Sequence, residues 1–113
     1  MTTPQHDFTL TLPTTDNSVP PNALVAGQMT QLNFVINGVT YTWPIPATDL
    51  PGAALTVTFA SLTPVFAPAA GTAYTADVFA VDANGNGTPS NTAAWTQIAA
   101  ATPPAAVTGF SVS

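Results

Sequence analysis

Basic side chains are missing altogether from this chain, whose 113 residues include no lysine and no arginine. Glutamate is absent as well, and the five acidic residues are all aspartates, so the formal net charge is −5. Because neutralising phosphates or anionic lipid headgroups requires cations, the composition argues against binding to nucleic acid or to a charged membrane. Stability must come from apolar burial and hydrogen bonds, since His6 and the amino terminus are the only possible partners for an aspartate.

Cysteine is also absent, so neither a disulfide framework nor a thiolate metal site is available. No stretch approaches the roughly eighteen apolar residues that a transmembrane helix needs. The first residues, MTTPQHDF, have neither a basic region nor an apolar run, so they are not expected to act as a secretory signal. The length is that of a single domain with one core.

Proline, threonine and alternating apolar residues are abundant, and together they favour strands over helices. In residues 8–13, Phe8, Leu10 and Leu12 share one face of the predicted strand. In residues 31–43, two alternating runs are joined by Asn37-Gly38, the strongest short hairpin signal. The other predicted strands cover 54–59, 73–82 and 91–99, with loops at 14–24, 44–52 and 63–71. This pattern predicts an all-β protein, an antiparallel sandwich of two sheets.

The segment DANGNG, residues 82–87, raises the question of a metal site. Asp82, Asn84 and Asn86 alternate as the ligands at the start of a calcium loop do, but the twelfth position of such a loop is Ala93 rather than a bidentate glutamate. The flanking residues alternate as strands, and Asn and Gly suit a turn with positive φ. A hairpin turn is therefore favoured, with a calcium site at these three residues as the minor alternative, and no cofactor is expected.

Residues 71–91, GTAYTADVFAVDANGNGTPSN, are similar to the last hairpin of a fibronectin type III domain. The resemblance covers most of residues 7–98, and the closing hairpin is its specific part. It implies a fibronectin type III or immunoglobulin-like β-sandwich over residues 1–100. In that fold Tyr74 is the structural corner tyrosine, with its hydroxyl bonded to nearby backbone. The matching residues are Gly71, Thr72, Tyr74, Val78, Ala80, Val81, Asp82, Gly85, Asn86, Ser90 and Asn91.

The aromatic residues and the single histidine offer few signs of chemistry. Trp43 and Trp95 are predicted to be structural, packed in the core or between the sheets, and a sugar-stacking platform formed with Tyr41 is the alternative. His6 lies beside Asp7 before the first strand, but no nucleophile motif surrounds any serine and the aspartates are scattered. The chain is therefore not expected to be an enzyme.

Residues 101–113 are predicted to form a proline-rich linker followed by a C-terminal strand or arm. The sequence TPPAAVTGFSVS is similar to the opening of a fibronectin type III domain, where it supplies the first strand, with Val107, Phe110 and Val112 as the apolar residues of the arm. The body, by contrast, is expected to begin with the second strand of that fold, which leaves an open sheet edge. The arm could return along its own sandwich, complete a neighbour's sheet or begin a second module; donation to a neighbour is the preferred hypothesis.

These features together predict a structural protein rather than a catalyst. One economical solution is a bacteriophage virion surface protein, a capsid decoration or tail-associated subunit made in the cytoplasm, whose partners are virion subunits or copies of itself. The alternative is an extracellular module, a spacer or carbohydrate-binding domain of a secreted bacterial enzyme or adhesin. A calcium-dependent adhesion domain is a third possibility.

Overall fold

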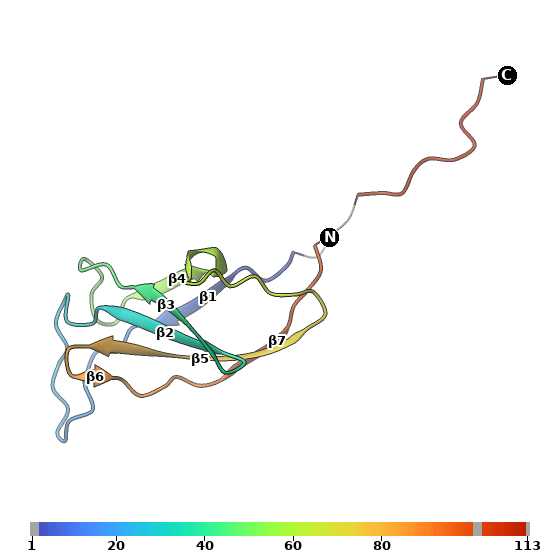
Figure 1. Cartoon of the computed structure of the whole chain (residues 1–113). Coiled ribbons are helices and arrows are strands. Elements are labelled where there is room, and N and C mark those ends of the chain that lie inside the picture. Colours follow the sequence, from blue (N-terminus) through green and yellow to red (C-terminus); the bar gives the residue numbers. More distant parts are fainter. Residues whose placement is uncertain (1–2, 101–102, 113) are drawn as a thin grey trace.

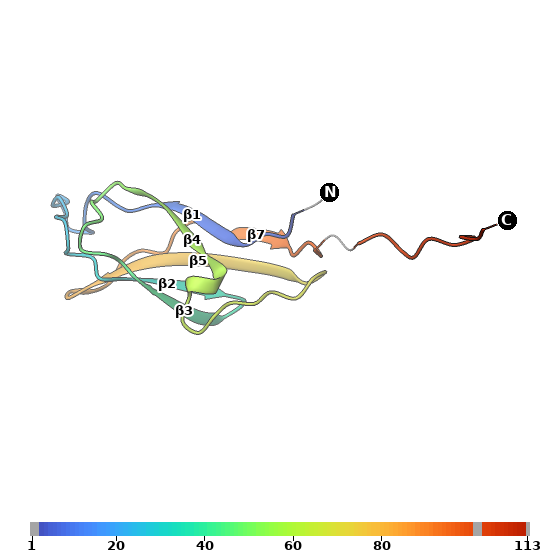
Figure 2. The same ribbon diagram turned by 90° about the horizontal axis from the view of Figure 1, so that it is seen from above.

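The strands of this chain form two antiparallel sheets in a computed structural model that describes residues 3–100 and 103–112. One sheet pairs β1 with β4, and the other has the order β3-β2-β5, with β6 and β7 both pairing with β5 (Figure 1). Figure 2 shows the sheets from their edges, with β1 on one side and β2 and β3 on the other. The elements are β1 (Asp7–Thr11), β2 (Gln31–Ile36), β3 (Val39–Pro44), β4 (Ala54–Thr58), the 3-10 turn η1 (Phe59–Ser61), β5 (Ala73–Asp82), β6 (Gly85–Asn86) and β7 (Ala93–Thr96).

The all-β class predicted from the alternation is confirmed, and the hairpin at residues 37–38 shows why. Asn37 and Gly38 have φ angles of 47° and 80°, the left-handed conformation that a tight two-residue turn requires and that these two residue types tolerate best. The turn fixes the register of β2 against β3, so that Leu32 lies opposite Trp43. Inward and outward faces of the larger sheet follow from that register.

The core lies between the two sheets and is closed at one end by aromatic rings. The apolar side of β2 is almost fully buried, and Leu12, next to β1, is only 1% exposed. Phe66 comes from the loop before β5, yet its ring centroid lies 4.9 Å from Phe59 and 5.3 Å from Tyr74. This loop residue therefore joins the rings of both sheets. The fully buried large side chains are Phe34, Leu12, Leu32, Leu62 and Val57.

The last predicted strand, 91–99, is shorter in the structure, where β7 covers only Ala93–Thr96, and the chain that precedes it beside β5 forms only the two-residue strand β6. Between them, Pro89 has no N–H to donate. Ser90 donates its own N–H to Val78 O at 2.8 Å, and its hydroxyl accepts the N–H of Val78 at 3.0 Å. A side-chain oxygen thus replaces a backbone carbonyl in the ladder, so the segment stays next to β5 without forming a regular strand.

The start of β1 and the end of β7 lie at the same end of the molecule, hereafter the terminal end. Gln5 joins them, because its backbone carbonyl accepts the Gln97 amide at 2.9 Å and its side-chain oxygen accepts the Ile98 N–H at 2.9 Å. The opposite end, hereafter the loop end, carries residues 12–30 and the turn after β5 (Figure 1). The described residues include no helix that could span a membrane.

Candidate functional site

One edge of β1 has no neighbouring strand among the described residues. His6 O accepts the Phe59 N–H at 2.8 Å, and Leu12 donates its N–H to Ala53 O at 2.9 Å, so the even-numbered residues bond toward β4. Because hydrogen-bonding directions alternate along an antiparallel strand, the backbone groups of the odd-numbered residues point away from β4. The N–H and C=O groups of Asp7, Thr9 and Thr11 therefore face outward, as on any uncovered sheet edge.

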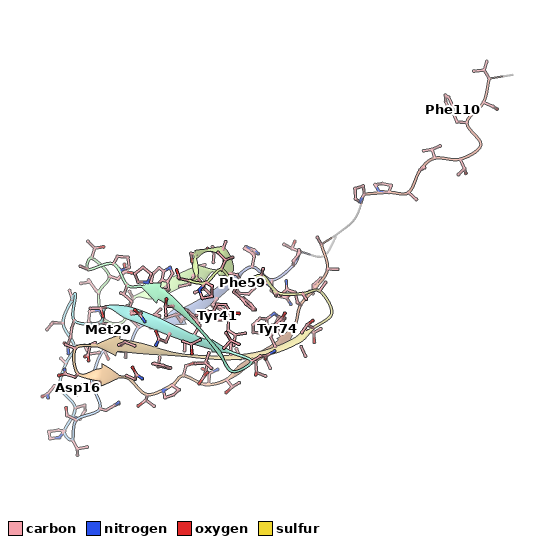
Figure 3. All side chains as sticks on the ribbon, viewed as in Figure 1. Asp16, Met29, Tyr41, Phe59, Tyr74 and Phe110 are labelled. Atoms are coloured by element: carbon pink, nitrogen blue, oxygen red, sulfur yellow. The ribbon has the colours of Figure 1, made fainter. Side chains whose placement is uncertain are left out.

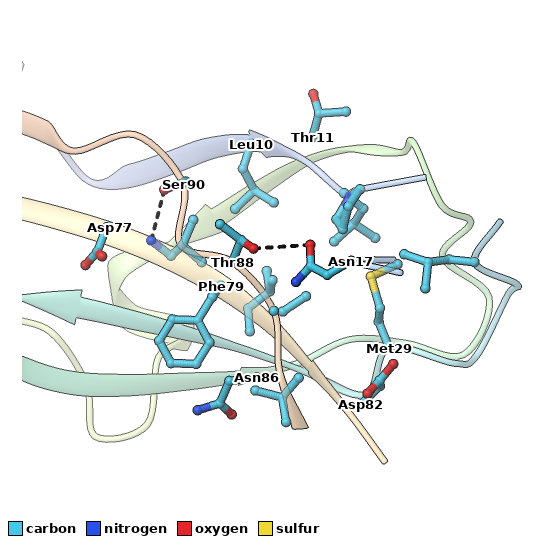
Figure 4. Close-up of a pocket in the computed structure, with 18 of the residues that line it drawn as sticks. Leu10, Thr11, Asn17, Met29, Asp77, Phe79, Asp82, Asn86, Thr88 and Ser90 are labelled. Carbon is cyan, nitrogen blue, oxygen red and sulfur yellow. Dashed lines mark hydrogen bonds between the residues drawn. The ribbon is translucent and has the colours of Figure 1, made fainter. Parts of the chain in front are cut away.

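An apolar groove of about 800 Å³ follows this edge and opens the core to the surface (Figure 4). Its floor is formed by β2 and β5, where Val78 and Ala80 are only half-buried. One wall is β1 with Phe8 and Leu10, which are also half-buried, and the other wall is the segment 85–91. At the loop end, the Thr88 hydroxyl donates to Asn17 Oδ1 at 3.2 Å and links the segment 85–91 to the loop that follows β1 (Figure 4).

Two other sheet edges are partly covered by the chain itself. On β3, Thr42 and Thr63 exchange two backbone hydrogen bonds of 2.9 Å, which places residue 63 along that edge. On β4, the carbonyl of Thr58 accepts the Ser61 hydroxyl at 2.7 Å. The edge of β1 differs from both because it adjoins a groove lined by core residues, so a strand added there would bury apolar side chains as well as satisfy backbone groups.

The C-terminal arm, residues 103–112, extends away from the sandwich and forms no strand (Figure 1). Its apolar residues Val107, Phe110 and Val112 are 86%, 90% and 94% exposed, and Figure 3 shows Phe110 far from the body. Gly109 has a φ of 71°, which interrupts the extended backbone between Val107 and Phe110. Residues 101 and 102, the predicted start of the linker, lie outside the described residues.

The DANGNG segment forms the turn between β5 and β6, where Asp82 lies opposite Gly85. Both carboxylate oxygens of Asp82 accept hydrogen bonds, one from the Asn84 N–H at 2.7 Å and one from the Gln28 amide at 3.3 Å. Asn84 and Asn86 are exposed. Within residues 3–100 and 103–112, no three His, Asp or Glu side chains are placed to hold a metal ion together.

Calcium is accordingly expected to leave the stability unchanged. An ion that bound only the folded chain would raise its melting temperature by mass action. Thermal melting in millimolar calcium should overlay melting in chelator, with magnesium as the matched control. A rise specific to calcium, lost in Asp82→Asn, would show that the turn holds the ion.

The aromatic side chains named from the sequence face the interior rather than a common outer surface. Tyr74 accepts the Ala69 N–H on its hydroxyl at 2.9 Å, and its ring stacks on Trp95 at 5.3 Å. Trp43 lies opposite Leu32 on the inner side of the sheet, and Tyr41 lies opposite Phe34. All four side chains are half-buried against the core. Strands β3 and β7 lie at opposite edges of the larger sheet, with β2 and β5 between them. They offer no shared exposed platform for a sugar.

A second polar cluster, which the sequence reasoning missed, shapes the loop beside the groove. The Asp16 carboxylate accepts the N–H groups of Ser18 at 3.0 Å and Asn22 at 2.8 Å, together with the Ser18 hydroxyl. The hydrogen bonds from Ser18 and Asn22 favour the charged form and lower the pKa of Asp16 to about 2. The signal in the sequence was the run Asp16-Asn17-Ser18. An aspartate side chain often accepts the backbone N–H of the residue two positions later and so forms a turn.

This loop is expected to keep its structure in acid until Asp16 is protonated. A lowered folded-state pKa gives stability that is present above the unfolded value near ~3.9 and is lost as pH falls toward about 2. Carboxyl-detected NMR should place the Asp16 midpoint near that lower value, and Ser18→Ala should raise it. A midpoint that Ser18→Ala leaves in place would contradict the assigned cause.

The only histidine, His6, lies just before β1 with its ring exposed, and its Nε2 atom is 3.3 Å from Asp7 Oδ2.

Comparison with family models, with curated proteins and with solved structures finds no match to this chain. The fold and the site define an all-β, two-sheet antiparallel sandwich. One edge of this sandwich is uncovered beside an apolar groove, and an exposed apolar arm follows the body.

Proposed function

We propose that this chain is a non-enzymatic structural protein with a fibronectin type III or immunoglobulin-like fold, which assembles through protein–protein contacts on a bacteriophage virion. It is a surface subunit, either a capsid decoration or a tail-associated protein, and its C-terminal arm adds a strand to a neighbouring subunit. The observation that carries the proposal is the arm itself, whose Phe110 and Val112 are 90% and 94% exposed in a chain that also has an uncovered sheet edge. Exposed apolar side chains of this kind mark interaction surfaces.

The fibronectin type III or immunoglobulin-like family is supported by one hydrogen bond and by the pairing of the strands. The Tyr74 hydroxyl bonds to the backbone five residues upstream, at Ala69, as the corner tyrosine of such sandwiches does. The pairing of β2 with both β3 and β5, and of β1 with β4, gives the two-sheet arrangement expected for the same fold.

The charge distribution suits a subunit that binds proteins beside packaged or ejected DNA. With no lysine or arginine and a net charge of −5, the surface repels phosphates, so the chain would not adhere to nucleic acid during assembly or after lysis. An uncharged arm is the part of the molecule best suited to approach another acidic subunit.

Electron microscopy with a gold-labelled antibody against this chain tests the virion assignment. Particles released by lysis of the source cells should carry label on the head or the tail, and a chain truncated after residue 100 should be lost from purified particles. Unlabelled particles would contradict the assignment. Label found instead on secreted protein would favour the extracellular module, whether spacer or carbohydrate-binding domain.

A further inference from the structure

We propose that the groove beside β1 is the acceptor for the C-terminal arm of a second copy of this chain. The arm enters at the loop end and runs antiparallel to β1, so that copies join head to tail. This inference rests on the strand donation proposed above and adds the acceptor site, the identity of the partner and the polarity of the assembly.

The arm and the edge are matched in length and in hydrogen-bonding groups. Residues 105–112 span about 26 Å when extended, whereas β1 spans about 17 Å, so the arm is long enough to cover the strand. The outward N–H and C=O groups of Asp7, Thr9 and Thr11 supply the partners for a new ladder. The uncovered backbone of β1 would then be satisfied in the same way as that of a central strand.

The side chains of the arm also match the groove. Phe110 and Val112 are two residues apart and share one face of an extended strand, while Ser111 points to the other. With that apolar face turned toward Val78 and Ala80 on the floor, Phe110 and Val112 fill the groove and Ser111 faces solvent beside the outer side of β1. Removing these apolar side chains from water favours the docked arm. The Thr88–Asn17 hydrogen bond joins exposed residues at the entrance, and the arm must pass it.

The direction of the chain favours a second copy over the arm's own groove. The chain leaves the body at the terminal end, where Ile98 bonds to Gln5, and β1 starts at that same end. To run antiparallel to its own β1, the arm would first have to cross to the loop end and turn back. Pro103 and Pro104 favour a stiff, extended segment instead, and the arm points away from the body at an oblique angle (Figure 1).

Such a contact joins two different surfaces of the same chain, so it does not close on itself. Each copy offers one arm and one groove, and repetition produces open linear assemblies rather than a symmetric dimer. Every copy carries a formal net charge of −5 and has no lysine or arginine, so the copies repel at low ionic strength. Added salt screens this repulsion, and assembly should grow with salt concentration as well as with protein concentration.

Disulfide trapping tests the site directly, because the chain has no cysteine of its own. Thr9 and Thr11 point outward from β1, and Ser111 points outward from the docked arm, so cysteines at one of the first pair and at Ser111 fall within bonding distance. Thr9→Cys/Ser111→Cys and Thr11→Cys/Ser111→Cys chains are oxidised and run on denaturing gels. The matched control is Thr56→Cys/Ser111→Cys, since Thr56 is equally exposed but lies on β4.

The expected result is a ladder of linked dimers and longer species in one or both β1 pairs and not in the control. A faster monomer band in a β1 pair would show the arm in its own groove and overturn the inference. Equal ladders in the control would mean random collision, and absence of any linked band would mean that the arm does not lie on β1. Either result overturns the proposed acceptor.

A second pair of variants tests whether self-association depends on the apolar face of the arm or on any charge added to the arm. Phe110→Asp and Ser111→Asp make the same change in charge on opposite faces, and neither can unfold the body because both residues are exposed on the extended arm. In sedimentation velocity, Phe110→Asp should weaken self-association at least about tenfold, equivalent to about 1.4 kcal/mol, while Ser111→Asp should retain it.

Equal weakening by the two variants would contradict the assigned facing of Phe110. Two further results distinguish this inference from the proposed function. A chain that stays monomeric in solution yet labels virions would overturn the second copy as partner and leave the virion role intact. Assembly through β1 without any virion label would do the reverse.

Discussion

Phe66→Ala is expected to lower the free energy of unfolding by about 3–5 kcal/mol, a large share of the stability of a domain of this size. The side chain is 5% exposed, and its ring packs against Tyr41 at 5.3 Å and Phe59 at 4.9 Å as well as Tyr74. Truncation removes these contacts from both sheets at once. The cavity that remains at the terminal end is bordered by rigid rings that relax poorly into it.

Urea denaturation followed by tryptophan fluorescence measures this effect, since Trp95 lies 6.2 Å from the Phe66 ring. The matched control is Val65→Ala at the preceding residue, which is 61% exposed and should change the unfolding free energy by less than about 0.5 kcal/mol. Should both variants unfold at the same urea concentration, the loop before β5 would not be part of the core.

Gln97→Met is expected to destabilise the fold by about 1–3 kcal/mol although it keeps the volume and adds apolar surface. Gln97 is 5% exposed, and its amide donates to Gln5 O at 2.9 Å while its oxygen accepts from Trp95 Nε1 at 3.0 Å. Methionine satisfies neither group. The loss leaves a carbonyl and an indole N–H without these partners, and it removes one of the hydrogen bonds that hold the segment before β1 against the end of β7.

Hydrogen exchange should locate the loss at this end of the molecule, with faster exchange at Ile98 because its N–H bonds to Gln5. Gln31→Met is the control, because Gln31 lies on the outer face of β2 and its amide bonds only to the Asn33 side chain. If Gln97→Met matched the parent chain in both stability and exchange, the Gln5–Gln97 contact would be incidental to the fold.

Short-range sequence signals determined the placement of several strands and one turn of this protein without any tertiary contact. Alternating apolar residues at Phe8, Leu10 and Leu12 placed β1, and Asn37-Gly38 fixed the turn and register of β2 and β3, because these signals act over a few residues. The absence of cations is likewise a property of composition alone, and it restricts the possible partners whatever the fold.

The groove and the residues that surround it were decided by tertiary structure. Phe66 belongs to no periodic pattern and became a core residue only through contacts made by distant rings. The chain between β6 and β7 stays beside β5 without a regular strand because the Ser90 hydroxyl accepts the Val78 N–H. The uncovered edge of β1 could be anticipated from the pattern of strands, but the groove beside it could not. Its depth depends on how far β1 stands from residues 85–91, and that distance is set by packing between segments remote in sequence.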